Sequence, residues 1–401
     1  ETDPNLAQSP KSDENETVSF RSVLRYPVYR RFLFFFLVCF LAFYERASFL
    51  SGYGAAYFGG CKSVQENNHC SKPFNYDRFN LVSQTSLSVA NLFAFISAPI
   101  IGKLSDIYGR KPLICVQIIY AIPYIIMLFY NDIFILLLLR SLQGFNGSTQ
   151  ISTPVTRAYI SDILPQRLHI MGYALMYLSS GFGLFLGEML GYVISSLFND
   201  HFNFYVITLL YALCLIYLLA FLPESNKRAA HHLQAANHDE DDRNINPFAV
   251  FKSCCMNKAV FWCAILTGLV TLPAMGLADI ATIVLAENFN ADSDHKYNAI
   301  ALYYVCGWSF GLMSGPIFVL PILRRFCTEY MIFVISICIL LLAIGAFMLV
   351  CLFKVLWTIS VVSFTLGIGF LCFAPLNSIL TKYTSKSQKG MAFGPMFACA
   401  S

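Results

Sequence analysis

Five ionisable side chains interrupt long apolar stretches of the sequence: Glu45, Arg46, Arg140, Glu188 and Asp279. A charge inside a lipid bilayer costs about 3 kcal/mol or more, so such residues are functional candidates. Three of them are acids and two are bases, so the bases can neutralise only two of the acids. A carboxylate left unpaired in a low dielectric holds a proton readily. This composition predicts that the group couples protons to solute binding.

Within this group, Glu188 or Glu45 is the first candidate for the proton carrier, with Arg140 as its switchable partner. Asp279 ranks third because its position near the end of an apolar stretch lets its side chain reach water. A static ion pair, or a residue at the membrane boundary, is the alternative for each acid.

A polar segment between two apolar stretches carries a second pattern, formed by Gly102, Asp106, Gly109, Arg110 and Lys111. The two glycines permit a tight turn and a close approach of two helices. Asp106 can pair with cations, and Arg110 can bind a carboxylate or the carbonyl groups at a helix end. These residues predict a charge network that latches one of two global states; a generic basic turn is the alternative.

Two further patterns predict structural contacts. Gly183, Gly187 and Gly191 surround Glu188, and small residues spaced by four let helix backbones touch. Cys61 and Cys70 flank a short polar segment expected outside the membrane, where they form either a disulfide or two free thiols.

The composition points to a membrane protein. Of the 401 residues, 57% are hydrophobic and 12% are charged, about half of the ~25% charge of soluble domains. High hydrophobicity excludes disorder, and a net charge of +4 without a Lys/Arg block excludes nucleic-acid binding. The sequence contains neither a nucleotide-binding loop nor a catalytic constellation. We therefore expect no enzyme activity, no cofactor and no metal.

Ten apolar runs are long enough to cross a bilayer. They lie near 32–58, 79–101, 112–131, 133–156, 169–197, 203–222, 259–286, 299–323, 329–351 and 355–380. Lipid offers no hydrogen-bond partners to the backbone, so these runs must be helices. Residues 390–401 look like the start of an eleventh helix, so the C-terminal bundle looks truncated. The predicted fold is an all-α polytopic membrane protein.

Charge in the loops predicts the orientation. Of the 27 Lys and Arg residues, 20 fall on the side that carries the N-terminus. Basic residues concentrate in cytoplasmic loops, so the N-terminus is expected in the cytoplasm. The sequence does not distinguish the plasma membrane from an organellar membrane.

The runs divide into two groups, which predicts a duplicated bundle. We expect a disordered cytoplasmic tail over 1–31, a six-helix bundle over 32–222, a cytoplasmic linker over 223–258 and a C-terminal bundle over 259–401.

The segment 102–111 resembles the loop signature of the major facilitator superfamily. Residues 140–144 and 222–225 resemble the superfamily's fourth-helix motif and its exit from helix six. Residues 97–101 and 158–163 are similar to the tetracycline-resistance-like group, which includes the hippocampus abundant transcript proteins.

The resemblance implies two bundles that rock about a central cavity and usually act as a monomer. It implies that Asp106 and Arg110, with Asp162 at the end of helix four, hold the inside closed. It associates Arg140 with proton coupling. The segment 183–192 resembles a signature of antiporters, with Glu188 in place of a proline, which slightly favours antiport over symport.

The sequence therefore predicts a secondary active transporter that moves a small solute across a lipid bilayer, coupled to protons. A uniporter is one alternative. A proton/oligopeptide symporter is another, since Tyr44, Glu45 and Arg46 partly match that group's first-helix motif. A receptor or scaffold without transport is the third.

Overall fold

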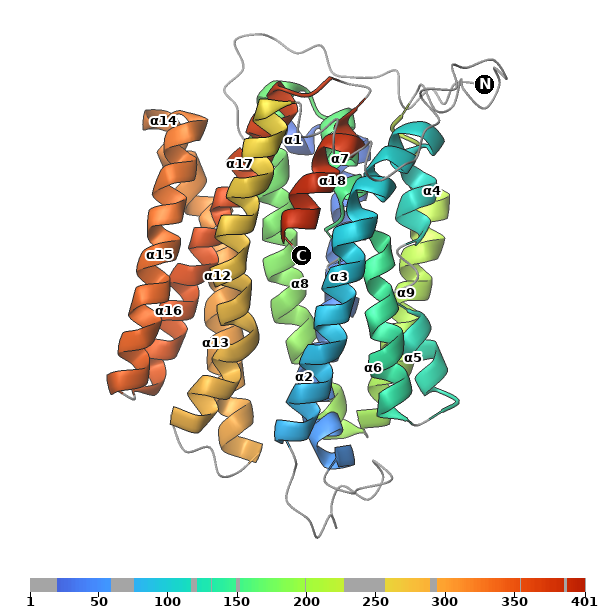
Figure 1. Cartoon of the computed structure of the whole chain (residues 1–401), viewed down its shortest axis with the longest axis vertical. Helices are drawn as coiled ribbons and strands as arrows, with labels where there is room; N and C mark the ends of the chain where they lie inside the picture. Colours follow the sequence, from blue (N-terminus) through green and yellow to red (C-terminus); the bar gives the residue numbers. More distant parts are fainter. Residues whose placement is uncertain are drawn as a thin grey trace.

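The computed structural model describes residues 20–58, 76–116, 121–130, 132–148, 152–198, 200–226, 257–288, 294–353, 355–385 and 388–400. Within these ranges every regular element is helical, and the helices stand side by side along the long axis (Figure 1). The tail up to residue 19, most of the linker, Cys61 and Cys70 lie outside the described residues.

We call the described helices up to residue 226 the first half and those from residue 257 the second half. The first half contains α1 (Phe20–Leu24), α2 (Pro27–Phe58), α3 (Tyr76–Tyr108), α4 (Arg110–Cys115), α5 (Ile122–Met127), α6 (Ile133–Leu142), η4 (Gln143–Asn146), α7 (Pro154–Ile163), η5 (Gln166–Leu168), α8 (His169–Leu197) and α9 (Asp200–Phe221). The second half contains α12 (Lys258–Asn288), α13 (Asp294–Ser314), η7 (Gly315–Val319), α14 (Leu320–Phe326), α15 (Glu329–Phe353), α16 (Leu356–Gly369), η8 (Phe370–Cys372), α17 (Phe373–Lys382) and α18 (Lys389–Ala400).

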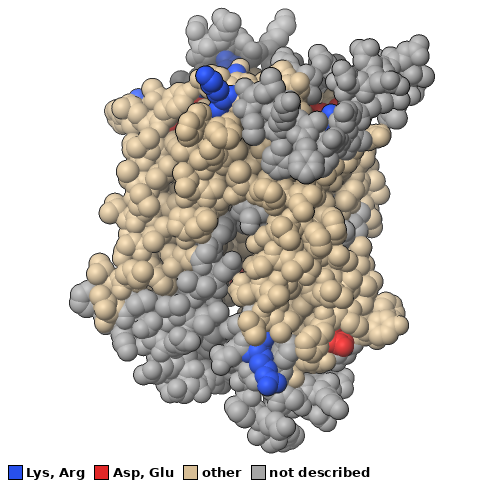
Figure 2. All heavy atoms as spheres, viewed as in Figure 1, with Lys and Arg blue, Asp and Glu red and all other residues tan. Residues whose placement is uncertain are grey.

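The chain is an integral, multi-pass membrane protein. Seven helical stretches in the described part are long and apolar enough to cross a bilayer, and two shorter apolar ones cover Ile133–Asn146 and Lys258–Pro273. Helix α8 spans the run predicted at 169–197, whereas the count of ten spans stays a prediction. On the face drawn in Figure 2, the described surface is mostly uncharged along its length, as a lipid-facing surface must be.

The fourth apolar run is not the continuous helix predicted over 133–156. Helix α6 ends at Leu142, η4 continues to Asn146, and Gly147 adopts a left-handed conformation with φ of 77°. Helix α7 then starts at Pro154, where Thr153 forms a reciprocal capping box with Thr156. A glycine at positive φ and a capped proline start are strong helix-boundary signals, and they outweigh apolar composition here.

The predicted disorder of the tail is wrong for its last part. Helix α1 occupies Phe20–Leu24, and α2 already begins at Pro27. The side chain of Val23 is fully buried, and α1 packs against α2 and α8. The free energy gained by burying this apolar side chain favours the ordered helix, although the polar composition of the tail predicted disorder.

Glycines set the closest helix contact of the first half. A Cβ atom at Gly183 would lie 2.4 Å from Cβ of Phe40, and one at Gly187 would lie 2.7 Å from the carbonyl oxygen of Leu41. Helices α8 and α2 therefore touch through their backbones, as the predicted small-residue ladder requires.

The halves meet along two helix pairs. Helix α8 packs on α13, where a Cβ atom at Gly181 would lie 3.0 Å from Cβ of Leu312. Helix α3 packs on α18, where a Cβ atom at Gly102 would lie 2.2 Å from the carbonyl oxygen of Gly390. The two halves are thus in backbone contact at the end where α18 begins (Figure 1).

We predict that Gly187→Ala lowers stability by about 1–3 kcal/mol, because the added methyl group overpacks the α2–α8 contact. Gly345→Ala in α15 is the matched control, since a Cβ atom there meets nothing within 4 Å. It should be neutral or stabilising by up to about 1 kcal/mol, as expected for Gly→Ala in a helix. Thermal unfolding of both purified variants in detergent checks this, and equal stability of the two would contradict the packing argument.

Candidate functional site

A sharp turn joins α3 to α4 at the end where α18 begins. Gly109 has φ of 102°, a conformation that favours glycine. A Cβ atom at this position would also lie 2.7 Å from a carboxylate oxygen of Glu224. The turn therefore needs glycine for its backbone conformation and for the approach of Glu224.

Glu224 caps the start of α4 from a distant part of the chain. Its Oε1 accepts a hydrogen bond from the backbone N–H of Arg110 and its Oε2 one from that of Lys111, both at 2.8 Å. The side-chain amide of Asn226 donates to the carbonyl oxygen of Asp106 at 2.9 Å. A carboxylate at a helix N-terminus satisfies free amides and complements the helix dipole. Sequence reasoning placed residues 222–225 only as a helix exit and missed this role.

Arg110 lies between two carboxylates of the first half. Its side chain is 1% exposed, with Nη2 2.5 Å from Oδ1 of Asp106 and Nε 3.1 Å from Oδ2 of Asp162. Burial acts to lower the pKa of Arg110, but the two carboxylates outweigh it and raise the pKa. The guanidinium group therefore remains charged and joins α3, α4 and α7.

Asp106 also binds the second half. Its Oδ1 accepts a hydrogen bond from the backbone N–H of Gly390 at 3.0 Å, and its Oδ2 one from that of Met391 at 2.8 Å. These amides belong to the first turn of α18. Asp106 thus caps a helix that lies in the other half of the molecule.

Lys389 adds an ion pair across the same interface. Its Nζ lies 3.2 Å from Oδ1 of Asp162 and donates to the carbonyl oxygen of Ser161 at 2.6 Å. The structure therefore brings together the predicted residues Asp106, Arg110 and Asp162, with Gly102 and Gly109 at the contact, and adds Lys389 and Glu224. Lys111 extends along α9, where its Nζ donates to the carbonyl oxygen of Leu219 at 2.9 Å.

A further set of contacts lies beside this network. Nδ1 of His169 lies 2.8 Å from the hydroxyl of Thr381, and Nη1 of Arg157 donates to Oδ1 of Asn377 at 2.8 Å. Arg324 donates from the second half to the carbonyl oxygen of Arg167 at 3.1 Å. We call the end of the molecule that holds these contacts and the Asp106 network the closed end.

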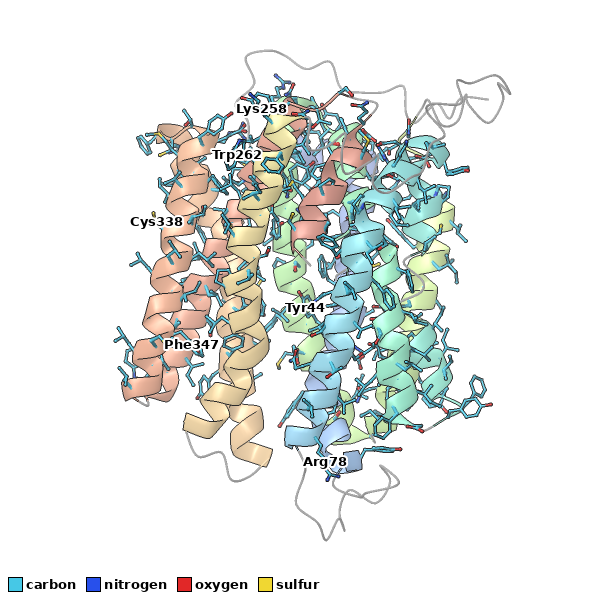
Figure 3. All side chains as sticks on the ribbon, in the orientation of Figure 1. Tyr44, Arg78, Lys258, Trp262, Cys338 and Phe347 are labelled. Carbon is cyan, nitrogen blue, oxygen red and sulfur yellow. The ribbon has the colours of Figure 1, made fainter. Side chains whose placement is uncertain are left out.

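The apolar helices bring two of the five intramembrane candidates together. Gly187 packs against the backbone at Glu45, and the charges of Glu45 and Glu188 are close enough to interact. Glu45 is fully buried and Glu188 is partly buried. Tyr44, which precedes Glu45, lies near mid-height of the molecule (Figure 3).

The other three candidates are less well defined. Arg140 is half-buried in the last turn of α6, whose main neighbours in the first half are α3 and α5. Arg46 and Asp279 lie on α2 and α12, but their side chains are outside the described part. Gly191 is buried on α8. Across the described residues, no three His, Cys, Asp or Glu side chains gather to hold a metal ion.

The family model of the Major Facilitator Superfamily matches residues 35–401. The chain belongs to this superfamily. The match covers both halves and the closed end between them.

Within the superfamily, curated relatives match part of the chain. The tetracycline resistance protein, class H, of Pasteurella multocida is 31% identical over 157 residues, 39% of this chain and 38% of that protein. The multidrug resistance protein MdtG of Proteus mirabilis is 30% identical over 154 residues, 38% of this chain and 37% of that protein. The hippocampus abundant transcript 1 protein of Homo sapiens is 24% identical over 191 residues, which are 47% of this chain and 37% of that protein. The chain thus matches less than two fifths of the length of each relative.

One solved structure shares the fold over nearly the whole chain. The crystal structure of the human organic anion transporter MFSD10 superposes with a TM-score of 0.66 at 17% sequence identity. The match covers 93% of this chain and 89% of that one. The two-bundle fold predicted for the superfamily is therefore confirmed.

We predict that Arg110→Lys lowers the free energy of unfolding by about 2–3 kcal/mol, because a lysine cannot reach both carboxylates and leaves one buried acid unpaired. Arg325→Lys is the matched control, since Arg325 is exposed at the end of α14. Thermal unfolding in detergent compares the two variants, and equal stability of both would contradict the proposed pairing.

Proposed function

We propose that this superfamily member is a secondary active transporter that moves a small organic solute by alternating access, coupled to protons. The observation that carries the proposal is the interface at the closed end. Asp106 there caps α18 and Lys389 pairs with Asp162 across the two halves. Noncovalent polar contacts of this kind can break and re-form, which a rocking motion between two states requires.

The side of the membrane that holds the closed end decides which state of the transporter this is. The two halves are hydrogen-bonded to each other there, so if this end lies in the cytoplasm, the protein is in the outward-facing state. Helix α1 and Lys258 lie at this end and Arg78 at the opposite end (Figures 1 and 3). A surplus of basic residues here supports a cytoplasmic N-terminus. The proposed bundles cover 32–222 and 259–401, joined by the linker 223–258.

We further propose that Glu45 and Glu188 couple transport to protons. The contact through Gly187 holds Glu45 and Glu188 close together inside the apolar bundle. A carboxyl group can accept and release a proton in each transport cycle, so we assign the coupling proton to Glu45 or Glu188. Arg140 is the proposed switchable partner, and antiport is slightly favoured over symport.

The relatives support a small organic solute as the substrate. Their printed names concern tetracycline, multiple drugs and organic anions. We propose that the protein acts as a monomer.

We predict that proteoliposomes of the chain show solute-dependent proton flux across an imposed pH gradient, read with an internal pH-sensitive dye. The solute panel contains sugars, amino acids, peptides, organic anions and drugs. Glu188→Gln should reduce the flux at least tenfold, because the amide cannot exchange a proton. Glu329→Gln is the control for loss of an acid, since Glu329 forms its ion pair with Lys382 at the closed end.

The flux measurements distinguish a proton-coupled transporter from a uniporter and from a protein that does not transport. Flux that disappears in Glu188→Gln but persists in the control supports coupled transport, and its direction separates antiport from symport. Labelled-solute flux that survives collapse of the proton gradient would make the protein a uniporter and would contradict coupling. If no solute moves in either assay, the transporter proposal fails.

We predict that Asp106→Asn opens the closed end. The neutral side chain loses charge-assisted hydrogen bonds to α18, each worth about 1.5–3 kcal/mol, which shifts a two-state equilibrium by tenfold or more. The readout is the rate of maleimide labelling of Ala392→Cys, buried at this end, with the exposed native cysteines replaced.

Asp132→Asn is the matched control for the latch experiment. Asp132 also accepts a backbone hydrogen bond at a helix start, from Phe134 at 2.8 Å, but within the first half and at the opposite end. Labelling should accelerate only in Asp106→Asn. Equal rates in the two variants would show that Asp106 does not latch the halves.

A further inference from the structure

Arg157 is a buried cation in the interface between the halves. Its position between two apolar runs makes it look like an ordinary cytoplasmic loop residue. In the structure it lies on α7, and only 7% of it is exposed. The hydroxyl of Tyr173 fixes its backbone by donating to its carbonyl oxygen at 3.1 Å.

The contacts of the Arg157 guanidinium group are all uncharged. Nη1 donates to Oδ1 of Asn377 at 2.8 Å, Nη2 to the hydroxyl of Tyr177 at 3.2 Å, and Nε to Oγ of Ser152 at 3.3 Å. The guanidinium carbon lies 4.2 Å from the centre of the Phe397 ring. Among the described residues, no carboxylate forms an ion pair with it.

Arg110 shows what a purely structural arginine requires in this protein. It is buried to a similar degree, but two carboxylates neutralise it. A buried charge without a counter-ion is strongly destabilising, and uncharged dipoles and a ring face offset only part of that cost. The environment of Arg157 therefore has the charge and the donors to bind an anion, but contains no anion of its own.

Two more polar groups lie on the same turn of α17. Asn377 and Ser378 are fully buried, and Oγ of Ser378 has no hydrogen-bond partner. Buried polar groups are nearly always satisfied, so this unpaired hydroxyl, next in sequence to Asn377, leaves the closed arrangement polar but incompletely satisfied.

The contacts of Arg157 divide between the halves. Ser152 and Tyr177 belong to the first half, and Asn377 and Phe397 belong to the second. Separation of the halves at the closed end removes the second pair and leaves the guanidinium group on α7 with free hydrogen-bond donors. A carboxylate can then take the place of Oδ1 of Asn377 in bidentate geometry.

We propose that Arg157, with Tyr177 beside it in the first half, forms a subsite for the anionic group of the transported solute: a carboxylate, sulfonate or phosphate. The subsite binds when the closed end opens, and the anion leaves when Asn377 and Phe397 return. The inference rests on the proposed transport function and adds the charge class of the solute.

The test uses the full chain in neutral-lipid nanodiscs and measures thermal unfolding with benzoate, benzenesulfonate or phenyl phosphate. Benzamide and benzenesulfonamide are the neutral counterparts. At least one anion should raise the melting temperature by about 2 °C or more, as expected for a ligand of the folded state. The neutral counterparts should have no effect.

The decisive variant is Asn377→Asp. It places a carboxylate 2.8 Å from the guanidinium nitrogen at the position of Oδ1, so the folded protein should be at least as stable as the wild type. Its apparent affinity for the anion should fall about tenfold or more, because the new carboxylate occupies the subsite. Asn257→Asp, at an exposed asparagine before α12, should bind the anion as the wild type does.

The proposal is overturned if no anion stabilises the wild type, or if Asn377→Asp keeps the full anion effect. Stabilisation by phosphatidylglycerol in the nanodisc without any effect of soluble anions would assign the subsite to a lipid headgroup and overturn it for the solute. Proton flux driven only by neutral or cationic solutes would leave transport intact and remove this inference. Stabilisation by an anion without any solute-dependent proton flux would leave the anion subsite intact and contradict the proposed transport function.

Discussion

The free amide groups at the start of a helix are the constraint on which the closed end depends. Helices α4 and α18 both begin where their first amides need partners from elsewhere in the chain. Glu224 supplies them for α4 from the same half, and Asp106 supplies them for α18 from the other half. One cap can therefore stay in place through a rocking motion, and the other must break.

Glycine determines where the helices form permanent contacts. At Gly187 the backbones of α8 and α2 touch, which fixes Glu188 beside Glu45 within one half. At Gly102 and Gly390 the close contact crosses between the halves and depends on the same polar network that closes this end. Glycine thus forms a contact within one half at Gly187, and a contact between the halves, which can separate, at Gly102 and Gly390.

Much of this organisation could be predicted from the sequence, since apolar runs report helices in lipid directly. The run at 169–197 is an example. The cluster of Asp106, Arg110 and Asp162 is instead implied by the resemblance to the superfamily. The break at Gly147 could not be predicted from hydropathy, because the surrounding residues are as apolar as a continuous span. The signal that could have found it was local: a glycine followed by Thr153 and Pro154.

Contacts between the two halves could not be predicted from the sequence. Helical periodicity shows which face of a helix is buried, but not which other helix packs against that face. From the sequence, Arg157 looks like a basic loop residue, and Glu224 looks like part of a helix exit. Residues 20–24 show the reverse error, since Val23 and its neighbours pack against the core in a segment whose polar surroundings predict disorder.

The Asp106 network also distributes charge unequally. Asp106 and Asp162 set two negative charges against the single positive charge of Arg110 in the first half, while Lys389 on the second half is positive. Opening the closed end separates these opposite charges and exposes both to solvent ions. Salt stabilises such separated charges by screening them. The ionic strength of the solution on that side of the membrane therefore helps to set how long the end stays shut.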